Sequence, residues 1–335
     1  MKSEDMILKA AIVHILDSSV GIPVLSDQSM EVGPDFSDFL KAHIEKITES
    51  DDVKHCTFAE GSEVKELLQN CTDNFVETSK QLAERLYDIM NANIDIPAAD
   101  VAMTVFGCKG KDYLAFLKMN YKTSYTHQTR ETDGGNSNEI ILQRALLPGQ
   151  GQRLSEAFVL DLSDGSLILA EKKYEVNGEK CFYFSELFLE CRAPLSQKSK
   201  LDIVTRAVDQ VAKKYYGDED AQKKMEIKDI ICNELEEQGE IKVSELREKV
   251  FPGSPEMLEE LDEKLDRYNL SYETVAPKNE QTIKKFQKQK LYTDTGIEIT
   301  IPMEEYRNPD HVEFITNMDG TISVLIKNIG VLSSK

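Results

Sequence analysis

The spacing of apolar positions changes several times along the chain and predicts where helices and strands lie. In segments of the N-terminal third, and again after residue 195, apolar residues recur every three or four positions, which is the spacing of one helix face. Between these segments they alternate with polar residues or form short unbroken runs, as is typical of strands. The helices predicted in this way span 34–48, 74–90, 196–216, 219–238, 244–250 and 255–268.

Strands are predicted near both ends and through the middle of the chain. The apolar run 6–16 indicates a buried strand, and residues 99–186 indicate an antiparallel meander joined by tight turns. Asn177-Gly178 is the strongest of the hairpin signals, because both residues tolerate a positive φ. Further strands are predicted at 22–25, 55–58, 291–292, 297–301, 312–316 and 321–326.

These elements together predict an α+β fold. A central antiparallel sheet is flanked by helices, with an acidic N-terminal helical region and a C-terminal helix-plus-hairpin region. The strands of the middle segment and the long helix that follows them, over 196–216, form the expected core.

Charge divides the chain into unequal regions. The formal net charge is −20, from 40 basic and 60 acidic residues. Residues 31–104 hold 6 basic and 16 acidic residues, net −10, and residues 216–270 hold 8 and 17, net −9, whereas residues 105–215 hold 16 and 14, net +2. With the change in periodicity, this layout predicts three regions: an acidic α/β region over residues 1–98, a sheet core with a long helix over residues 99–215, and acidic helices with terminal strands over residues 216–335.

The sequence carries no recognisable catalytic or metal-binding motif. The six cysteines form no CxxC pair and the five histidines form no HxxxH or HxH pair, so we predict no structural metal and no disulfide framework. Gly149-Gln150-Gly151 lacks the remainder of a phosphate-loop or dinucleotide pattern, which favours an ordinary loop. We therefore predict no cofactor and no enzyme activity. The run 6–16 is too short to span a membrane and lacks a signal-cleavage pattern, so we expect a cytosolic protein without membrane contact.

Local basic clusters stand out against the acidic total. Residues 118–130 interleave cations with amides and aromatic rings, a mixture that suits a nucleic-acid backbone, although a polar solvent face has the same composition. Residues 276–292 hold 5 basic residues and 1 acidic residue, net +4, and a solvated helical face is again the alternative. Helices 244–250 and 255–268 have helix-turn-helix spacing, but the second is too acidic to read DNA. The candidate DNA contacts are Lys118, Lys122, Arg130, Lys198, Lys200, Lys284, Lys285, Lys288 and Lys290.

Six segments follow one another in a recognisable order along the chain. They are Asp100–Phe106, Tyr113–Tyr121, Gln143–Pro148, Glu171–Tyr174, Tyr183–Cys191 and Ser196–Lys200. The fifth is rich in phenylalanine, ends in a cysteine and precedes the basic start of a helix. This order resembles the bacterial 37-kDa nucleoid-associated protein family, with the clearest similarity at 99–215. The family is similarly acidic in total charge, and it supplies no catalytic residues to transfer.

The resemblance implies association with the nucleoid. The expected partners are double-stranded DNA, bound weakly and without sequence preference, or DNA-associated proteins. The alternative is a protein-interaction or DNA-mimic module, whose acidic faces at 31–104 and 216–270 dock on a basic partner. A weaker alternative is an enzyme of nucleic-acid metabolism without a recognisable motif. The expected location is the cytoplasm and the nucleoid, and the sequence leaves a homo-oligomer open.

Overall fold

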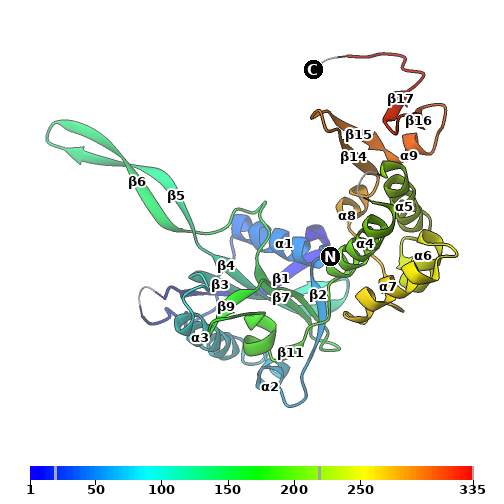
Figure 1. The fold of residues 1–335 in the computed structure, drawn as a ribbon. Helices are drawn as coiled ribbons and strands as arrows, with labels where there is room; N and C mark the ends of the chain where they lie inside the picture. The colour runs from blue at the N-terminus through cyan, green and yellow to red at the C-terminus, as the bar shows by residue number, and fades with distance from the viewer. Residues whose placement is uncertain (19–20, 218–219, 334–335) are drawn as a thin grey trace. The chain divides into compact units, whose positions relative to one another are not determined.

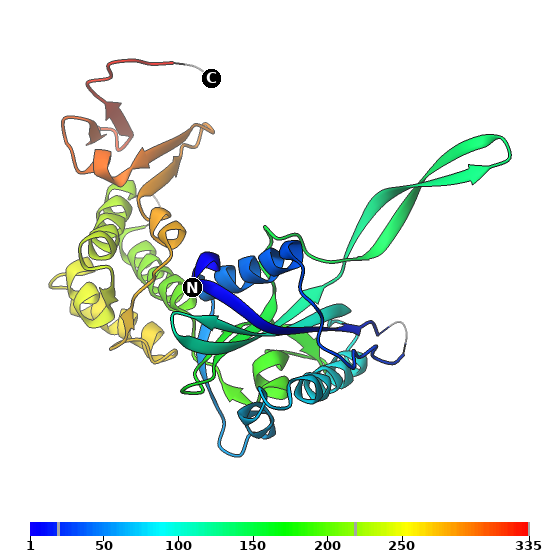
Figure 2. The ribbon, with the colours of Figure 1, turned by 180° about the vertical axis from the view of Figure 1, so that it is seen from behind.

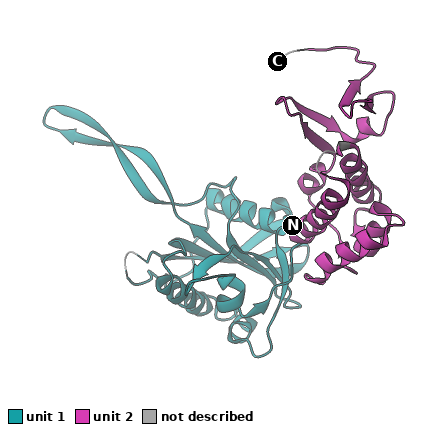
Figure 3. Cartoon of the chain, in the orientation of Figure 1, with its two compact units in different colours: residues 1–196 teal, residues 197–335 magenta. Residues whose placement is uncertain are grey.

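The chain folds into two compact units. The computed structural model describes residues 1–18, 21–217 and 220–333. Unit 1 is Met1–Ser196 and unit 2 is Gln197–Lys335 (Figure 3). The three regions predicted at 1–98, 99–215 and 216–335 do not coincide with these units, because the first strand of the chain pairs with a strand that begins at Ala99. The predicted α+β fold is confirmed.

A seven-stranded antiparallel sheet forms the centre of unit 1 (Figures 1 and 2). Its strands lie in the order β1-β3-β4-β7-β8-β2-β11. The strands β3 and β4 pair over their full length, from Ala99 opposite Asn120 to Cys108 opposite Lys111. The bounds are β1 Met6–Leu16, β2 Lys54–Phe58, β3 Ala99–Cys108, β4 Lys111–Asn120, β7 Glu156–Asp161, β8 Leu167–Ala170 and β11 Cys191–Arg192.

Helices pack on both faces of this sheet, so its inner strands are buried on both sides. Leu40 and Ile44 of one helix join Phe106 in the core of one face. Leu86 of another helix joins Phe116 in the core of the opposite face. Because successive side chains of a strand point to opposite faces, the inner strands read as nearly continuous apolar runs. The helices of unit 1 are α1 Pro34–Thr48, α2 Glu63–Gln69 and α3 Phe75–Ala92, with a short helical turn η1 Ser3–Asp5 and a π-helical turn η2 Phe184–Phe188.

Two strands leave this sheet and form a hairpin of their own. We call this hairpin, β5 Lys122–Thr132 with β6 Gly135–Leu146, the arm; it extends away from the body of unit 1 (Figure 1). Polar residues lie on both of its faces, so these strands are not suited to a sheet that is covered on both sides. The strand β4 pairs directly with β7 instead. The prediction of one continuous meander through 99–186 is therefore wrong for this stretch.

The shorter predicted features of unit 1 had different outcomes. Asn177 and Gly178 take φ values of 53° and 85° and join β9 Tyr174–Val176 to β10 Glu179–Cys181, as the hairpin signal predicted. The predicted strand at 22–25 is reduced to a single bridge between Ile15 and Val24.

Unit 2 combines a helical layer with short hairpins. The long helix α4 Gln197–Tyr216 buries Leu201, Val204 and Val208. Among the described residues, no helix is both long enough and apolar enough to cross a membrane. The other helices are α5 Ala221–Asn233, the π-helical turn η3 Glu234–Gln238, α6 Val243–Val250, α7 Pro255–Asp266, α8 Glu280–Lys284 and α9 Met303–Tyr306. The strand pairs are β12 Ile241–Lys242 with β13 Thr274–Val275, β14 Lys288–Tyr292 with β15 Glu298–Pro302, and β16 Val312–Thr316 with β17 Ile322–Ile326.

Candidate nucleic-acid interface

The nine predicted DNA contacts fall at separate places in the two units. Lys118 lies in the central sheet of unit 1, and Lys122 and Arg130 lie on the arm. Both arm residues are exposed, and the guanidinium of Arg130 lies 3.5 Å from the carboxylate of Glu139 on the opposite strand. The remaining six belong to unit 2, at the start of α4 and across α8 and β14.

Lys118 is fully buried, which removes it from the candidate contacts. Its Nζ lies 3.7 Å from Oε2 of the equally buried Glu156, donates to the backbone oxygen of Pro97 at 3.1 Å, and also donates to Asn120 Oδ1. Burial lowers the pKa of Lys118 to about 8, against the opposing effect of Glu156. The prediction assumed a polar outer face on this strand, whereas β4 is covered on both faces.

The two lysines at the start of α4 are also poorly placed for a phosphate. The Nζ of Lys200 lies 2.5 Å from Oε2 of Glu273, and the Lys200 side chain is only 16% exposed. Lys198 is half-buried in the same turn. Neither residue presents a solvated cation comparable to those of the arm or of β14.

The basic run 284–290 crosses from the end of α8 into β14. Lys284 pairs with Glu280 at 2.9 Å, and Lys290 pairs with Glu298 on the neighbouring strand at 2.7 Å. Lys285 and Lys288 are exposed, and neither forms an ion pair with a described residue. The four lysines of this run therefore divide into two that are neutralised locally and two that face solvent as uncompensated charges.

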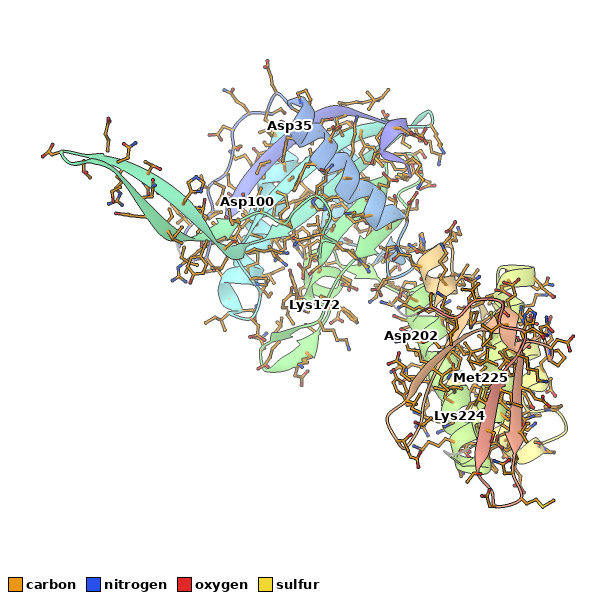
Figure 4. All side chains as sticks on the ribbon, turned by 90° about the horizontal axis from the view of Figure 1, so that it is seen from above. Asp35, Asp100, Lys172, Asp202, Lys224 and Met225 are labelled. Atoms are coloured by element: carbon orange, nitrogen blue, oxygen red, sulfur yellow. The ribbon has the colours of Figure 1, made fainter. Side chains whose placement is uncertain are left out.

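A cavity of about 400 Å³ lies beside this run, between α4, α5 and β14. Lys213 of α4 and Lys224 and Lys228 of α5 line it, with Asp209 as the lining carboxylate. Lys228 is half-buried and donates to the backbone oxygen of Lys288 at 2.7 Å. Burial lowers the pKa of Lys228. Phe286 and Gln289 of the basic run also line this cavity. Figure 4 labels Lys224, which belongs to α5.

Sequence reasoning missed the three helical lysines of this cavity. Lys224 and Lys228 are four residues apart, which places both on one side of a helix. The segment 216–270 is net −9, however, and that total concealed the cations within it. Only the packing of α5 against α4 and β14 shows that these lysines converge. We call Lys213, Lys224, Lys228, Lys285 and Lys288 the lysine site.

A larger cavity in unit 1 lacks such an excess of positive charge. Its volume is about 670 Å³, and Lys9, Lys109 and Lys111 line it. Each of the three pairs with an aspartate, at 2.5, 3.2 and 2.8 Å respectively. These lysines serve as a comparison group of cavity-lining cations whose charges are compensated.

Some carboxylates on the acidic helices of unit 2 form ion pairs with cations of the same unit. Glu260 of α7 pairs with Lys214, and Asp262 pairs with Arg247. Glu256, Glu259 and Glu263 of the same helix are exposed and form no ion pair with a described residue.

In the described stretches of the chain, no group of three or more histidine, cysteine or acidic side chains has the arrangement of a metal site.

Comparison with known protein families identifies the family to which the chain belongs. A family model described as nucleoid-associated protein YejK matches residues 12–331, which is nearly the whole length and includes both units. The chain belongs to this family. The resemblance noted in the sequence is thereby confirmed, and the YejK family name indicates a nucleoid-associated protein. A search of individually curated proteins finds no match.

Proposed function

We propose that this YejK-family protein attaches to the nucleoid through direct, sequence-independent contact between double-stranded DNA and the lysine site of unit 2. The observation that supports this most is the convergence of Lys213, Lys224 and Lys228 on one cavity that Phe286 and Gln289 also line. The exposed Lys285 and Lys288 are the sequence neighbours of these two residues. In a chain of net charge −20, this concentration of amines is the surface best suited to phosphate.

The environment of Lys228 fits a site that receives an anion. Its ammonium is half-buried, and the atom it contacts is a neutral backbone oxygen of β14. A buried charge with incomplete compensation is unfavourable, which is why the pKa of this amine is lowered. A phosphate oxygen in the cavity supplies the missing negative charge and raises that pKa. Binding and protonation of Lys228 therefore favour one another.

The number of available cations limits the strength of binding. Five lysines neutralise at most five phosphates, and each contact contributes about 0.9 to the slope of log affinity against log salt on B-DNA. The slope is then at most about −4.5. Because the rest of the chain is acidic and repels DNA, we expect affinity in the range of non-specific binding, about 10⁻⁴–10⁻⁶ M at physiological salt.

The chemistry of the lysine site also explains the absence of sequence preference in this proposal. A lysine ammonium is a point charge that contacts phosphate oxygens, and such contacts carry no base information. The acidic helix α7 is unsuited to a groove, since Glu256, Glu259 and Glu263 repel the phosphates on both sides. We propose a non-enzymatic role, in which attachment to DNA is itself the function.

Paired variants of equal charge test this proposal. Lys228→Gln/Lys285→Gln in the full chain removes two cations from the lysine site, and Lys9→Gln/Lys109→Gln removes two cations of unit 1 that each pair with an aspartate. Fluorescence anisotropy at low salt on two duplexes of unrelated sequence should show weaker binding for the first variant, by the same factor on both duplexes. Equal losses for the two variants would mean that only total charge matters, and the lysine site would be rejected.

A second candidate is attachment through a DNA-associated basic protein. The observation that favours it is the exposed row of Glu256, Glu259 and Glu263 on α7, which forms no ion pair with a described residue. Replacing these three by glutamine should leave DNA affinity unchanged or slightly stronger under the first proposal. If nucleoid association in cells is lost in that variant while DNA affinity of the purified protein is retained, the protein-partner candidate replaces direct DNA contact.

A further inference from the structure

The arm of unit 1 is an isolated two-stranded ribbon. Its strands β5 and β6 hold 11 and 12 residues and pair with each other from Lys122 opposite Leu146 to Thr132 opposite Gly135. All of β5 and most of β6 are exposed. Two-stranded hairpins without a packing surface are marginally stable in water. An arm of this length therefore gains stability from a second surface that covers it.

One face of the arm carries large apolar side chains at mid-length. Tyr125 lies opposite Leu142, and His127 lies opposite Ile140, so all four point to the same face. The exposed fractions are 72% for Tyr125, 71% for Ile140 and 38% for Leu142. Apolar surface of this kind on a projecting element marks a protein-interaction site more than a DNA contact.

The charges of the arm are separated along its length. The base carries Lys122 and Arg144, and the tip carries Glu131 and Asp133. Between them, Arg130 pairs with Glu139, which lies near mid-length. The base is therefore +2 and the tip is −2, with one compensated ion pair between them. Three cations and three carboxylates cancel over the whole arm, in contrast to the chain at net −20. A neutral arm with an acidic tip attracts DNA poorly, but it is complementary to a reversed copy of itself.

We propose that the arm pairs with the arm of a second copy of this chain, antiparallel, about a two-fold axis at the middle of the ribbon. In this arrangement the acidic tip of each arm lies against the basic base of the other. The faces with Tyr125, Ile140 and Leu142 meet at the axis. Such an interface is isologous, so one patch supplies both halves of the contact. This inference goes beyond the DNA proposal and does not depend on it.

The size of the arm sets the strength of the association. At about 3.3 Å per residue the arm is roughly 36 Å long, and two strands about 4.8 Å apart make it roughly 10 Å wide. One face then buries roughly 350 Å² per copy, well below the ~800 Å² per partner of a stable interface. The dimer should therefore form reversibly, with a concentration dependence that sedimentation velocity resolves.

A charge-swap pair tests the antiparallel arrangement. The base variant is Lys122→Glu/Arg144→Glu, and the tip variant is Glu131→Lys/Asp133→Lys. Each alone places like charges against one another in the dimer. Mixed together, the base variant and the tip variant restore opposite charges at both ends. All substituted positions lie on the exposed arm, so far-UV circular dichroism should show an unchanged fold for both variants.

The expected result is a wild-type dimer that grows with concentration, two monomeric variants, and a dimer in their mixture. A further variant, Ile140→Ser, should also weaken the wild-type dimer by removing its apolar centre. A wild type that stays monomeric at every concentration would overturn the inference, as would a mixture that stays monomeric. If the base variant loses DNA affinity while the wild type is monomeric, the arm belongs to DNA instead of to a second copy.

Discussion

The division of the basic run into compensated and uncompensated lysines has a measurable consequence for DNA binding. Lys285→Gln/Lys288→Gln removes the two exposed lysines, and Lys284→Gln/Lys290→Gln removes the two that pair with Glu280 and Glu298. Both variants change the total charge by the same amount and alter the same short stretch of chain. A difference between them therefore reports local pairing and not net charge.

The magnitude follows from counterion release. Two phosphate contacts contribute about 1.8 to the salt slope, so Lys285→Gln/Lys288→Gln should flatten the slope by up to that amount. Over a roughly four-fold rise in salt, this difference changes the ratio of wild-type to variant affinity about ten-fold. The variant Lys284→Gln/Lys290→Gln should flatten the slope by less than about 1, because its lysines already have carboxylate partners. Its affinity at one salt concentration can still fall, since two glutamates are left unpaired near the DNA.

The assay is fluorescence anisotropy of a labelled duplex over a salt series, with both variants and the wild type. Exposed lysine-to-glutamine changes usually cost about half a kcal/mol or less, so the fold should persist and circular dichroism can verify it. Equal slopes for the two variants, or an unchanged slope for Lys285→Gln/Lys288→Gln, would refute the division of the run and remove β14 from the site.

Three further predictions concern unit 1. Lys118→Met should lower the free energy of unfolding by about 3–5 kcal/mol, because Glu156 is left buried without its cation. In urea unfolding, the double variant Lys118→Met/Glu156→Leu should recover much of this loss. A single variant as stable as the wild type would contradict the buried pair. His43 packs against the ring of Phe39, and burial lowers its pKa from 6.5 to about 4. Its contribution to stability is therefore fully present above pH 6.5 and is lost as the pH falls toward 4. The loss should amount to about 2 kcal/mol between about pH 8 and pH 5. His43→Leu should reduce that pH dependence of the urea midpoint, and an identical pH profile would contradict the assignment. Gly178→Val should destabilise the β9–β10 hairpin because φ is 85° there, and faster amide exchange at Glu179–Cys181 should report it, with unchanged exchange as the contrary result.

Much of the fold was predictable because local patterns and tertiary packing agree. The helix over 34–48 and the strand over 6–16 have the predicted bounds, since the helix carries one clear periodicity and the strand is a single apolar run with clear ends. The arm was misassigned because an exposed ribbon and an exposed sheet edge have the same polar composition. The prediction for Lys118 was wrong because a cation within an apolar strand usually indicates a solvent-exposed face. The sequence does not show that Lys118 has a buried partner, Glu156, on a neighbouring strand.

The lysine site was only partly predictable. Lys285 and Lys288 belong to a run that is visible in the sequence, but the ion pairs of Lys284 and Lys290 depend on a turn and a strand partner. Lys213 and Lys228 come from different helices, and net charge over a segment says nothing about which faces meet. The total of −20 is therefore compatible with a local basic site, which only the packing of unit 2 makes visible.

The most direct test of the account is the salt dependence of DNA binding by the unmodified full chain. The lysine site predicts a linear fall of log affinity with log salt, with a slope between about −2.7 for three contacts and about −4.5 for five contacts on B-DNA. It also predicts the same slope on duplexes of unrelated sequence, because phosphate contacts carry no base information. A slope near zero, or no measurable binding at the lowest salt concentration, would contradict direct DNA contact through unit 2.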